Sequence, residues 1–383
     1  MSIDNRETNN LSEQKKSGLS LIFKLIPAIF ISYIFLLLIT KDTSSILLIS
    51  ISLVNGLIFT LGNILWNRRK RLQNTSENFT EANNSEIKPQ QNIREQILNK
   101  ANQGENPSSL NLIFADLKDV QLIGINFNDM YLSGVELNNA NLTDAQLIGV
   151  DLSEANLCKA KLINAQLVSA NLNSIKLIGA NLNNANLRDS NLSTAILNDA
   201  CLIDAKLLGA NLSDAKLLNA NLTNAKLDRA YLWNASLNNA QLVNADFTSA
   251  YMNNVKLNYA NLTSATLKDA QLTEAKLKNA NLASVNLTGA QLDNANLKNA
   301  NLSEACLEKA NLENTNLEDA NLDNTDLRKA NLTNTNFINT KVKNARFGWN
   351  LGMKEDLQLY LKQEGAIFED ELLNSNPGKG NSE

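Results

Sequence analysis

An apolar residue recurs at every fifth position over most of the chain, and this period constrains the fold more than any other feature. Counting in fives from Leu112 to Phe347 meets 48 consecutive apolar positions without an insertion, and nearly all of them are leucine. The residue two places before them is mostly alanine, with Val, Ile, Ser and Thr among the variants. In the representative stretch 221–240, the predicted core residues include Leu222, Leu227, Leu232, Leu237, Ala225 and Ala230.

A five-residue period fits neither regular helix nor regular strand. Five residues rotate an α-helix by about 500°, so the leucines would be spread around its whole surface. In a flat strand the alanine and the following leucine share one face, but the next alanine falls on the other. Both residues can point inward throughout only if the chain turns a corner once per repeat. The pattern therefore predicts a solenoid with a leucine and alanine interior.

The energetics of such a solenoid require contacts between its coils. Burying one leucine side chain contributes about 2 kcal/mol, whereas ordering the backbone costs about 1–2 kcal/mol for each of the five residues in a repeat. Side-chain burial alone is therefore insufficient. The backbone N–H and C=O groups of successive coils must also hydrogen-bond along the stack. These requirements predict a parallel β-solenoid.

The unit Ala220-Asn221-Leu222-Thr223-Asn224 resembles the repeat of the pentapeptide-repeat family. The resemblance implies an all-β fold, a right-handed quadrilateral parallel β-helix with four repeats per coil, which we place at residues 108–349. With 48 repeats, 12 coils are expected. The apolar N-terminal region makes the chain similar to membrane-anchored cyanobacterial members of the family.

The residues directly before the leucines support a coil of 20 residues. Three tyrosines at this position are separated by multiples of 20, and so are four lysines on a different phase. We therefore expect two ladders on two different sides of the solenoid. The two sets are Tyr131, Tyr231 and Tyr251, and Lys176, Lys216, Lys256 and Lys276.

Two apolar runs, 19–40 and 45–66, precede the repeats, and each is 22 residues long. About 20 helical residues cross the hydrocarbon core of a bilayer. We therefore expect a transmembrane hairpin within 19–71. Lysines and arginines flank the pair on both sides, which places the N-terminal tail 1–18 and the repeats on the cytoplasmic side. The alternatives are a cleaved signal peptide, for which no convincing cleavage site is present, and a buried soluble hairpin.

The remaining segments are predicted to be a linker, two caps and a tail. Residues 72–91 are polar and predict a flexible linker. An open solenoid exposes apolar core and strand edges at its ends, so helical caps are expected at 92–107 and 350–370. Residues 371–383 are expected to be disordered. The predicted contacts of the second cap are Met353, Leu357, Tyr360 and Leu361, followed by a short strand at Ile367 and Phe368.

Composition argues against an enzyme. The chain has no histidine, which removes histidine metal sites and histidine-activated nucleophiles. Its three cysteines, Cys158, Cys201 and Cys306, are too far apart for a designed ligand spacing, and no phosphate-binding glycine loop occurs. We therefore predict no catalytic, cofactor-binding or metal-binding residue and no cofactor.

Four aromatic residues gather near the middle of the repeats: Tyr231, Trp233, Tyr251 and Tyr259. One interpretation is stacking between coils. The other is a binding patch, because exposed aromatic side chains anchor protein interfaces.

The leading functional hypothesis is a non-enzymatic interaction scaffold in a bacterial plasma or thylakoid membrane. Its partners would be the bilayer, through the two N-terminal helices, and a protein of unknown identity, with a homodimer as a further option. The alternative is a DNA-mimicking rod that binds a topoisomerase, as in another branch of the family. Residues 108–349 contain 23 acidic and 20 basic residues, which is too mixed a surface for such a mimic. No nucleic-acid partner is expected.

Overall fold

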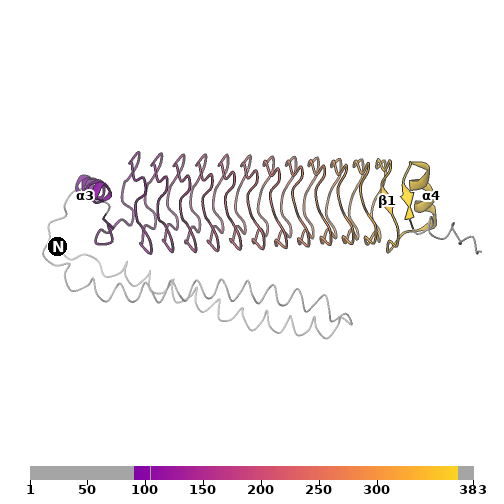
Figure 1. Ribbon diagram of the computed structural model, residues 1–383, viewed down its shortest axis with the longest axis horizontal. Coiled ribbons are helices and arrows are strands. Elements are labelled where there is room, and N and C mark those ends of the chain that lie inside the picture. Colours follow the sequence, from indigo (N-terminus) through magenta and orange to yellow (C-terminus); the bar gives the residue numbers. More distant parts are fainter. Residues whose placement is uncertain (1–89, 104, 370–383) are drawn as a thin grey trace, which may run out of the picture. The chain divides into compact units, whose positions relative to one another are not determined.

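The computed structural model describes residues 90–103 and 105–369 (Figure 1). Within these ranges, no helix is both long and apolar enough to span a bilayer. Several expected segments lie wholly or mostly outside the described residues: the tail 1–18, the transmembrane hairpin 19–71 with its spans 19–40 and 45–66, the linker 72–91 and the tail 371–383.

Each five-residue repeat forms one side of a four-sided coil. The residue before each leucine, which we call the bridging residue, pairs in parallel with the residue 20 positions later, as Tyr231 pairs with Tyr251. This pairing continues from Asp116 to Leu351 and stacks the coils in one direction (Figure 1). The predicted parallel β-solenoid with four repeats per coil is therefore confirmed.

Backbone hydrogen bonds join each coil to both of its neighbours. The N–H of Lys226 donates to the carbonyl of Ala205 in the preceding coil at 2.9 Å, and the N–H of Leu227 donates to Asp246 in the following coil at 2.7 Å. Within the repeat, the N–H of Ala230 donates to the carbonyl of Leu227 at 3.0 Å and closes the corner. These bonds supply the contacts between coils that the energetics required.

The two residues after each leucine form the corner, and we call them the first and second turn residues. The second turn residue is left-handed in every repeat from Phe114 to Asn344, with φ of 58° at Asn239. A left-handed third residue in a four-residue turn is the type II arrangement. The N–H of the first turn residue is accepted by a bridging Asn or Asp, as Thr223 donates to Asn221 Oδ1 at 3.0 Å.

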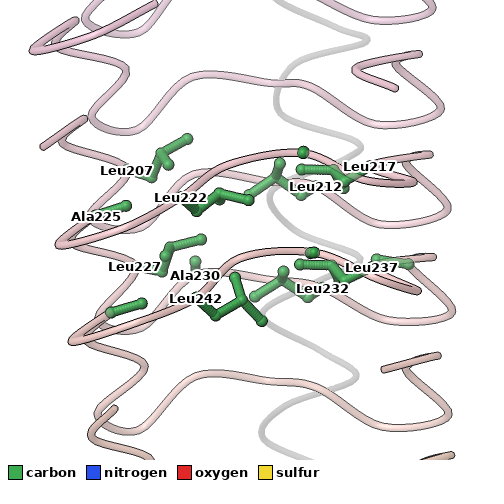
Figure 2. Close-up of a cluster of buried hydrophobic side chains, with 14 of the residues drawn as sticks. Leu207, Leu212, Leu217, Leu222, Ala225, Leu227, Ala230, Leu232, Leu237 and Leu242 are labelled. Atoms are coloured by element: carbon green, nitrogen blue, oxygen red, sulfur yellow. The ribbon is translucent and has the colours of Figure 1, made fainter. Parts of the chain in front are cut away.

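The leucines and the small residues form the interior. Figure 2 shows leucines of successive coils, such as Leu207 and Leu227, stacked above one another inside the solenoid. Six representative residues are fully buried, with 0% exposure: Leu222, Leu227, Leu232, Leu237, Ala225 and Ala230.

The N-terminal end of the solenoid is covered by helix α3, Gln90–Gln103. Ile97 of α3 is fully buried and belongs to the same apolar core as the first leucines of the solenoid. The helix begins two residues before the predicted segment 92–107 and ends four residues before its limit. The N–H of Glu105 donates to the carbonyl of Lys100 at 2.9 Å, a bond that closes the last turn of the helix.

The C-terminal end is covered by helix α4, Glu355–Gln363, and by strand β2, Ile367–Phe368. Strand β2 pairs in parallel with β1, Arg346–Phe347, which belongs to the last coil. Leu361 of α4 is fully buried, and the ring of Phe368 stacks on Phe347 with centroids 5.2 Å apart. The open edge and apolar interior of the last coil are therefore both covered.

Candidate interaction site

Three of the four predicted aromatic residues form one cluster on the solenoid. The rings of Tyr231 and Tyr251 are stacked with centroids 4.9 Å apart and an interplanar angle of 5°. Trp233 meets Tyr231 edge to face, at 6.4 Å and 84°. We call Tyr231, Trp233 and Tyr251 the aromatic cluster.

The coil geometry explains the cluster. Tyr231 and Tyr251 are paired bridging residues on adjacent coils, and hydrogen-bonded strands lie about 4.8 Å apart, which is the spacing of stacked rings. Trp233 is the first turn residue of the same repeat as Tyr231, so it stands at the adjoining corner. The stacking that the sequence suggested as one interpretation is present, and it fixes the three rings as a preformed group.

Tyr259 lies apart from the aromatic cluster. The chain between Tyr251 and Tyr259 passes through one corner and then along the side that contains the bridging residue Lys256 before it reaches the next corner. No ring contact among the described residues includes Tyr259, and 60% of it is exposed. The predicted patch is therefore a group of three residues on one side and a separate tyrosine at a more distant corner.

The polar atoms of the aromatic cluster are partly shielded from water. Burial raises the pKa of Tyr231 above its usual value, and the neighbouring Tyr251 raises it further, so the Tyr231 hydroxyl is neutral at pH 7. The indole Nε1 of Trp233 is buried and has no hydrogen-bond partner among the described residues. The accessible surface of the cluster therefore consists mainly of ring atoms.

The described residues contain little that resembles a reactive site. Within 90–103 and 105–369, no group of three or more His, Cys, Asp or Glu residues could hold a metal ion. The three cysteines are free thiols at partly exposed positions.

Sequence reasoning missed a second group of exposed side chains. Ile178, Leu218 and Tyr259 are exposed at one line of corners, beside the predicted lysine ladder. A five-residue period treats all corners alike, so it does not separate this one from the other three. Sorting the corner residues by the 20-residue coil would have brought the three together.

The described chain is thus a four-sided parallel β-solenoid, a class of repeat protein in which each repeat unit contacts only its neighbours. A family model described as pentapeptide repeats (8 copies) matches overlapping segments from 111–145 to 310–348, which together cover 111–348 without a gap. The chain belongs to the pentapeptide-repeat family. Members of this family fold as right-handed β-helices.

Solved structures of several pentapeptide-repeat proteins are similar to this chain. HetL of the cyanobacterium Nostoc sp. strain PCC 7120, involved in heterocyst differentiation regulation, is 29% identical, with 66% of this chain and 95% of HetL covered and a TM-score of 0.20. A trypsin-treated variant of QnrB1, a plasmid-mediated fluoroquinolone resistance protein, is 17% identical over 60% of this chain and 90% of its own, with a TM-score of 0.29.

A pentapeptide-repeat protein of the Arabidopsis thaliana thylakoid lumen is 27% identical over 37% of this chain and 83% of its own, with a TM-score of 0.17. A comparison with curated proteins finds no match. Because all of these TM-scores are low, the assignment rests on the family match and on the coil geometry.

Proposed function

We propose that the protein is a non-enzymatic scaffold that presents its solenoid to a protein partner through the aromatic cluster. Pentapeptide-repeat proteins are in general structural or interaction proteins, which supports this assignment. The observation that carries the proposal is the preformed stack of Tyr231 and Tyr251 with Trp233 against it. Tyr and Trp are the residues most enriched among those that dominate binding energy at interfaces.

The rigidity of the aromatic cluster favours binding. Each ring is held by its neighbours and by a backbone that hydrogen-bonds to two coils, so little side-chain freedom remains to be lost on association. A flat solenoid side also lets a partner contact several coils at once. The site therefore suits a protein surface with an apolar pocket more than it suits a small molecule.

Membrane anchorage is the second part of the proposal. It is supported by the sequence of the runs 19–40 and 45–66, each long enough to cross a bilayer, and by the basic residues on both sides of them. We infer an integral membrane protein of a bacterial plasma or thylakoid membrane, with the repeats on the cytoplasmic side. The anchor would set where the scaffold works, and the linker would set its reach.

A DNA-mimicking rod is not favoured over the scaffold. Such a mimic needs a dense surface of one sign, whereas acidic and basic side chains are mixed along these repeats and several pair with each other.

The proposal is tested by capture of partners with crosslinking in cells that express the full chain. Trp233→Ala and Tyr251→Ala should each reduce capture about 10- to 30-fold, the loss typical of a dominant interface residue. Tyr131→Ala is the matched control, because Tyr131 is a bridging residue on the same side, five coils away. Equal capture by all three variants would place the interface elsewhere. Loss of the chain from the membrane fraction after removal of residues 1–71 tests the anchor separately.

A further inference from the structure

Four lysines occupy the bridging position on one side of the solenoid. Lys176, Lys216, Lys256 and Lys276 lie in a single parallel ladder, in which Ile196 and Ser236 hold the intervening positions. The first three are exposed and the fourth is half-buried. With coils about 4.8 Å apart, the four ammonium groups extend along about 24 Å of the rod.

The charge on this side is not neutralised by the protein. No ion pair among the described residues includes any of the four lysines. Lys256 and Lys276 are directly paired across adjacent coils, and like charges in such a pair are unfavourable. On the opposite side of the solenoid, by contrast, Lys226 lies 3.7 Å from Asp246 of the next coil.

Three acidic residues border the lysines: Asp199, Asp214 and Glu274. Among the described residues, Glu274 forms no ion pair with any of the four lysines, and the other two accept hydrogen bonds from asparagines. Asp199 accepts a hydrogen bond from Asn219 at 3.0 Å, and Asp214 accepts one from Asn234 at 3.2 Å. The lysines therefore remain available to an external anion.

The repeats that carry the lysines compensate for the missing asparagine. A bridging lysine cannot accept the N–H of its first turn residue, as a bridging Asn does. At Leu218 that N–H donates instead to Asn198 Oδ1 of the preceding coil at 3.1 Å. The same bond joins Asn258 to Asn238 and Lys278 to Asn258, each at 3.0 Å. In these three repeats the N–H of the first turn residue is therefore paired although the bridging position carries a lysine.

Apolar side chains accompany the lysines at the next corner. Ile178 is 39% exposed, Leu218 is 38% exposed and Tyr259 is 60% exposed. They follow Lys176, Lys216 and Lys256 by two or three residues. We call the four lysines together with Ile178, Leu218 and Tyr259 the lysine face.

We propose that the lysine face lies on an anionic lipid surface. Lysines near such a surface are attracted to its negative charge, and exposed aliphatic residues and tyrosine enter the headgroup layer beside them. The charge complementarity, the straight line of cations and the adjacent apolar corner all fit a plane of anionic headgroups. The inference rests on the proposed membrane location and adds an orientation to it.

The test is lysine reactivity in the full chain, reconstituted into vesicles of phosphatidylcholine alone or of phosphatidylcholine with phosphatidylglycerol. A water-soluble acylating reagent modifies exposed lysines, and mass spectrometry measures the reaction rate of each one. Lys256 and Lys276 should react several-fold more slowly on the anionic vesicles, and high salt should abolish the difference. Lys206 and Lys226, a paired set on the opposite side, should react equally on both vesicles and serve as the internal control.

Matched variants complete the test. In the double variant Lys256→Gln and Lys276→Gln, protection of Lys216 on anionic vesicles should fall towards its value on neutral vesicles. In the control double variant, Lys206→Gln and Lys226→Gln, the protection of Lys216 on anionic vesicles should be unchanged. Equal reactivity of Lys256 on the two vesicles would overturn the proposal. Protection by soluble polyglutamate but not by anionic vesicles would also overturn it, and would assign the face to an acidic protein.

The proposed membrane anchor and the proposed role of the lysine face are contradicted by different results. Flotation of the full chain with neutral vesicles at high salt depends on the two apolar runs alone. Flotation without protection of Lys256 on anionic vesicles would retain the anchor and reject the lysine face. Protection on anionic vesicles without flotation on neutral ones would retain the face and reject the anchor.

Discussion

At the scale of single residues, the bridging asparagines perform two functions. Asn261 accepts the N–H of Thr263 at 3.2 Å, which completes the hydrogen bonding of the corner. The Nδ2 of Asn261 also donates to Gln241 Oε1 of the preceding coil at 3.1 Å, and Asn301 continues the same ladder through Asn281 at 3.0 Å. The abundance of asparagine at this position thus follows from local turn chemistry and from stacking together.

The second turn residue explains the other frequent polar residues of the repeat. Its left-handed backbone costs an ordinary residue about 1–2 kcal/mol, but glycine adopts it freely and Asn or Asp adopts it readily. Asn, Asp and Gly hold most of these positions from 114 to 344. A larger residue such as Tyr259, with φ of 61°, is tolerated because its side chain projects into solvent.

A pair of substitutions at Asn239 tests the cost of this backbone conformation. Asn239 has φ of 58°, is exposed, and its N–H donates to the carbonyl of Asn258 at 3.0 Å. Asn239→Val should lower the free energy of unfolding by about 1–2 kcal/mol, because a β-branched residue is strained there. Asn239→Gly should change it by less than about 0.5 kcal/mol. Urea unfolding distinguishes the two, and equal midpoints would contradict the strain argument.

At the scale of elements, the C-terminal cap is joined to the solenoid by ionic hydrogen bonds as well as by β2. Arg346 Nε donates to Glu369 Oε1 at 2.7 Å, and Arg328 Nη1 donates to Glu369 Oε2 at 3.1 Å. Arg328 also binds Asp326 through its Nε at 2.9 Å. One carboxylate beyond β2 is thus held by arginines of two successive coils.

The carboxylates of this network have lowered pKa values. The hydrogen bond from Arg346 is the largest cause for Glu369, and Arg328 adds to it against the opposing effect of burial. Burial alone would raise the pKa of Asp326, but the hydrogen bonds and charge of Arg328 and the charge of Arg346 outweigh it. A carboxyl whose pKa is lowered on folding stabilises the folded state above its unfolded pKa, and this contribution disappears as the pH falls through the folded value.

The predicted consequence is a cap that loosens in acid. At pH 7, Glu369→Gln should lower protection of the Ile367 amide, which donates to Ala345 at 2.8 Å, by the equivalent of about 1–2 kcal/mol. As the pH falls below the usual carboxyl range and through the lowered pKa of Glu369, the variant and the parent should converge, because the parent carboxyl becomes protonated. Hydrogen exchange measures both effects. Glu364→Gln, in the same cap but outside the network, is the control, and an equal loss in that variant would exclude the ionic explanation.

At the scale of the whole described unit, much of the fold follows from the repeat alone. The five-residue period determines which residues point inward and where the chain turns, and burial of residues such as Leu227 and Ala230 agrees with it. The handedness and the number of sides came from the family resemblance. The left-handed turn residue was not predicted, because a period in hydrophobicity contains no information about φ.

The candidate site was less predictable than the fold. Tyr231, Trp233, Tyr251 and Tyr259 are near one another in sequence, but sequence distance is a poor guide in a coil where residues eight apart stand on different sides. Tyr231 and Tyr251, 20 residues apart, are in ring contact. Whether Ile178 and Leu218 share a surface with the lysines depends on the coil length, which only the bridging pattern establishes.

The coil as a unit predicts how the solenoid tolerates deletion. Removing residues 281–300 removes one coil and should leave a single cooperative melting transition, because Asn301 then stacks on Asn261 and all four sides keep their register. Removing 281–297, nearly the same length, places Leu302 out of phase with the preceding leucines. That variant should lose cooperativity or melt at a much lower temperature by circular dichroism. Equal behaviour of the two deletions would show that register between coils contributes little to stability.

The five positions of the repeat differ in how freely they can vary, and this difference determines how new binding specificities can arise. In each repeat the leucine and the small residue two places before it are buried in the interior. The choice of the second turn residue is restricted by its left-handed backbone. The bridging and first turn residues remain, with the single condition that one of them, or a neighbour in the preceding coil, accepts the turn N–H. A combinatorial library that varies only these two positions under that condition would sample many different surfaces while leaving the interior and the left-handed turn residues unchanged.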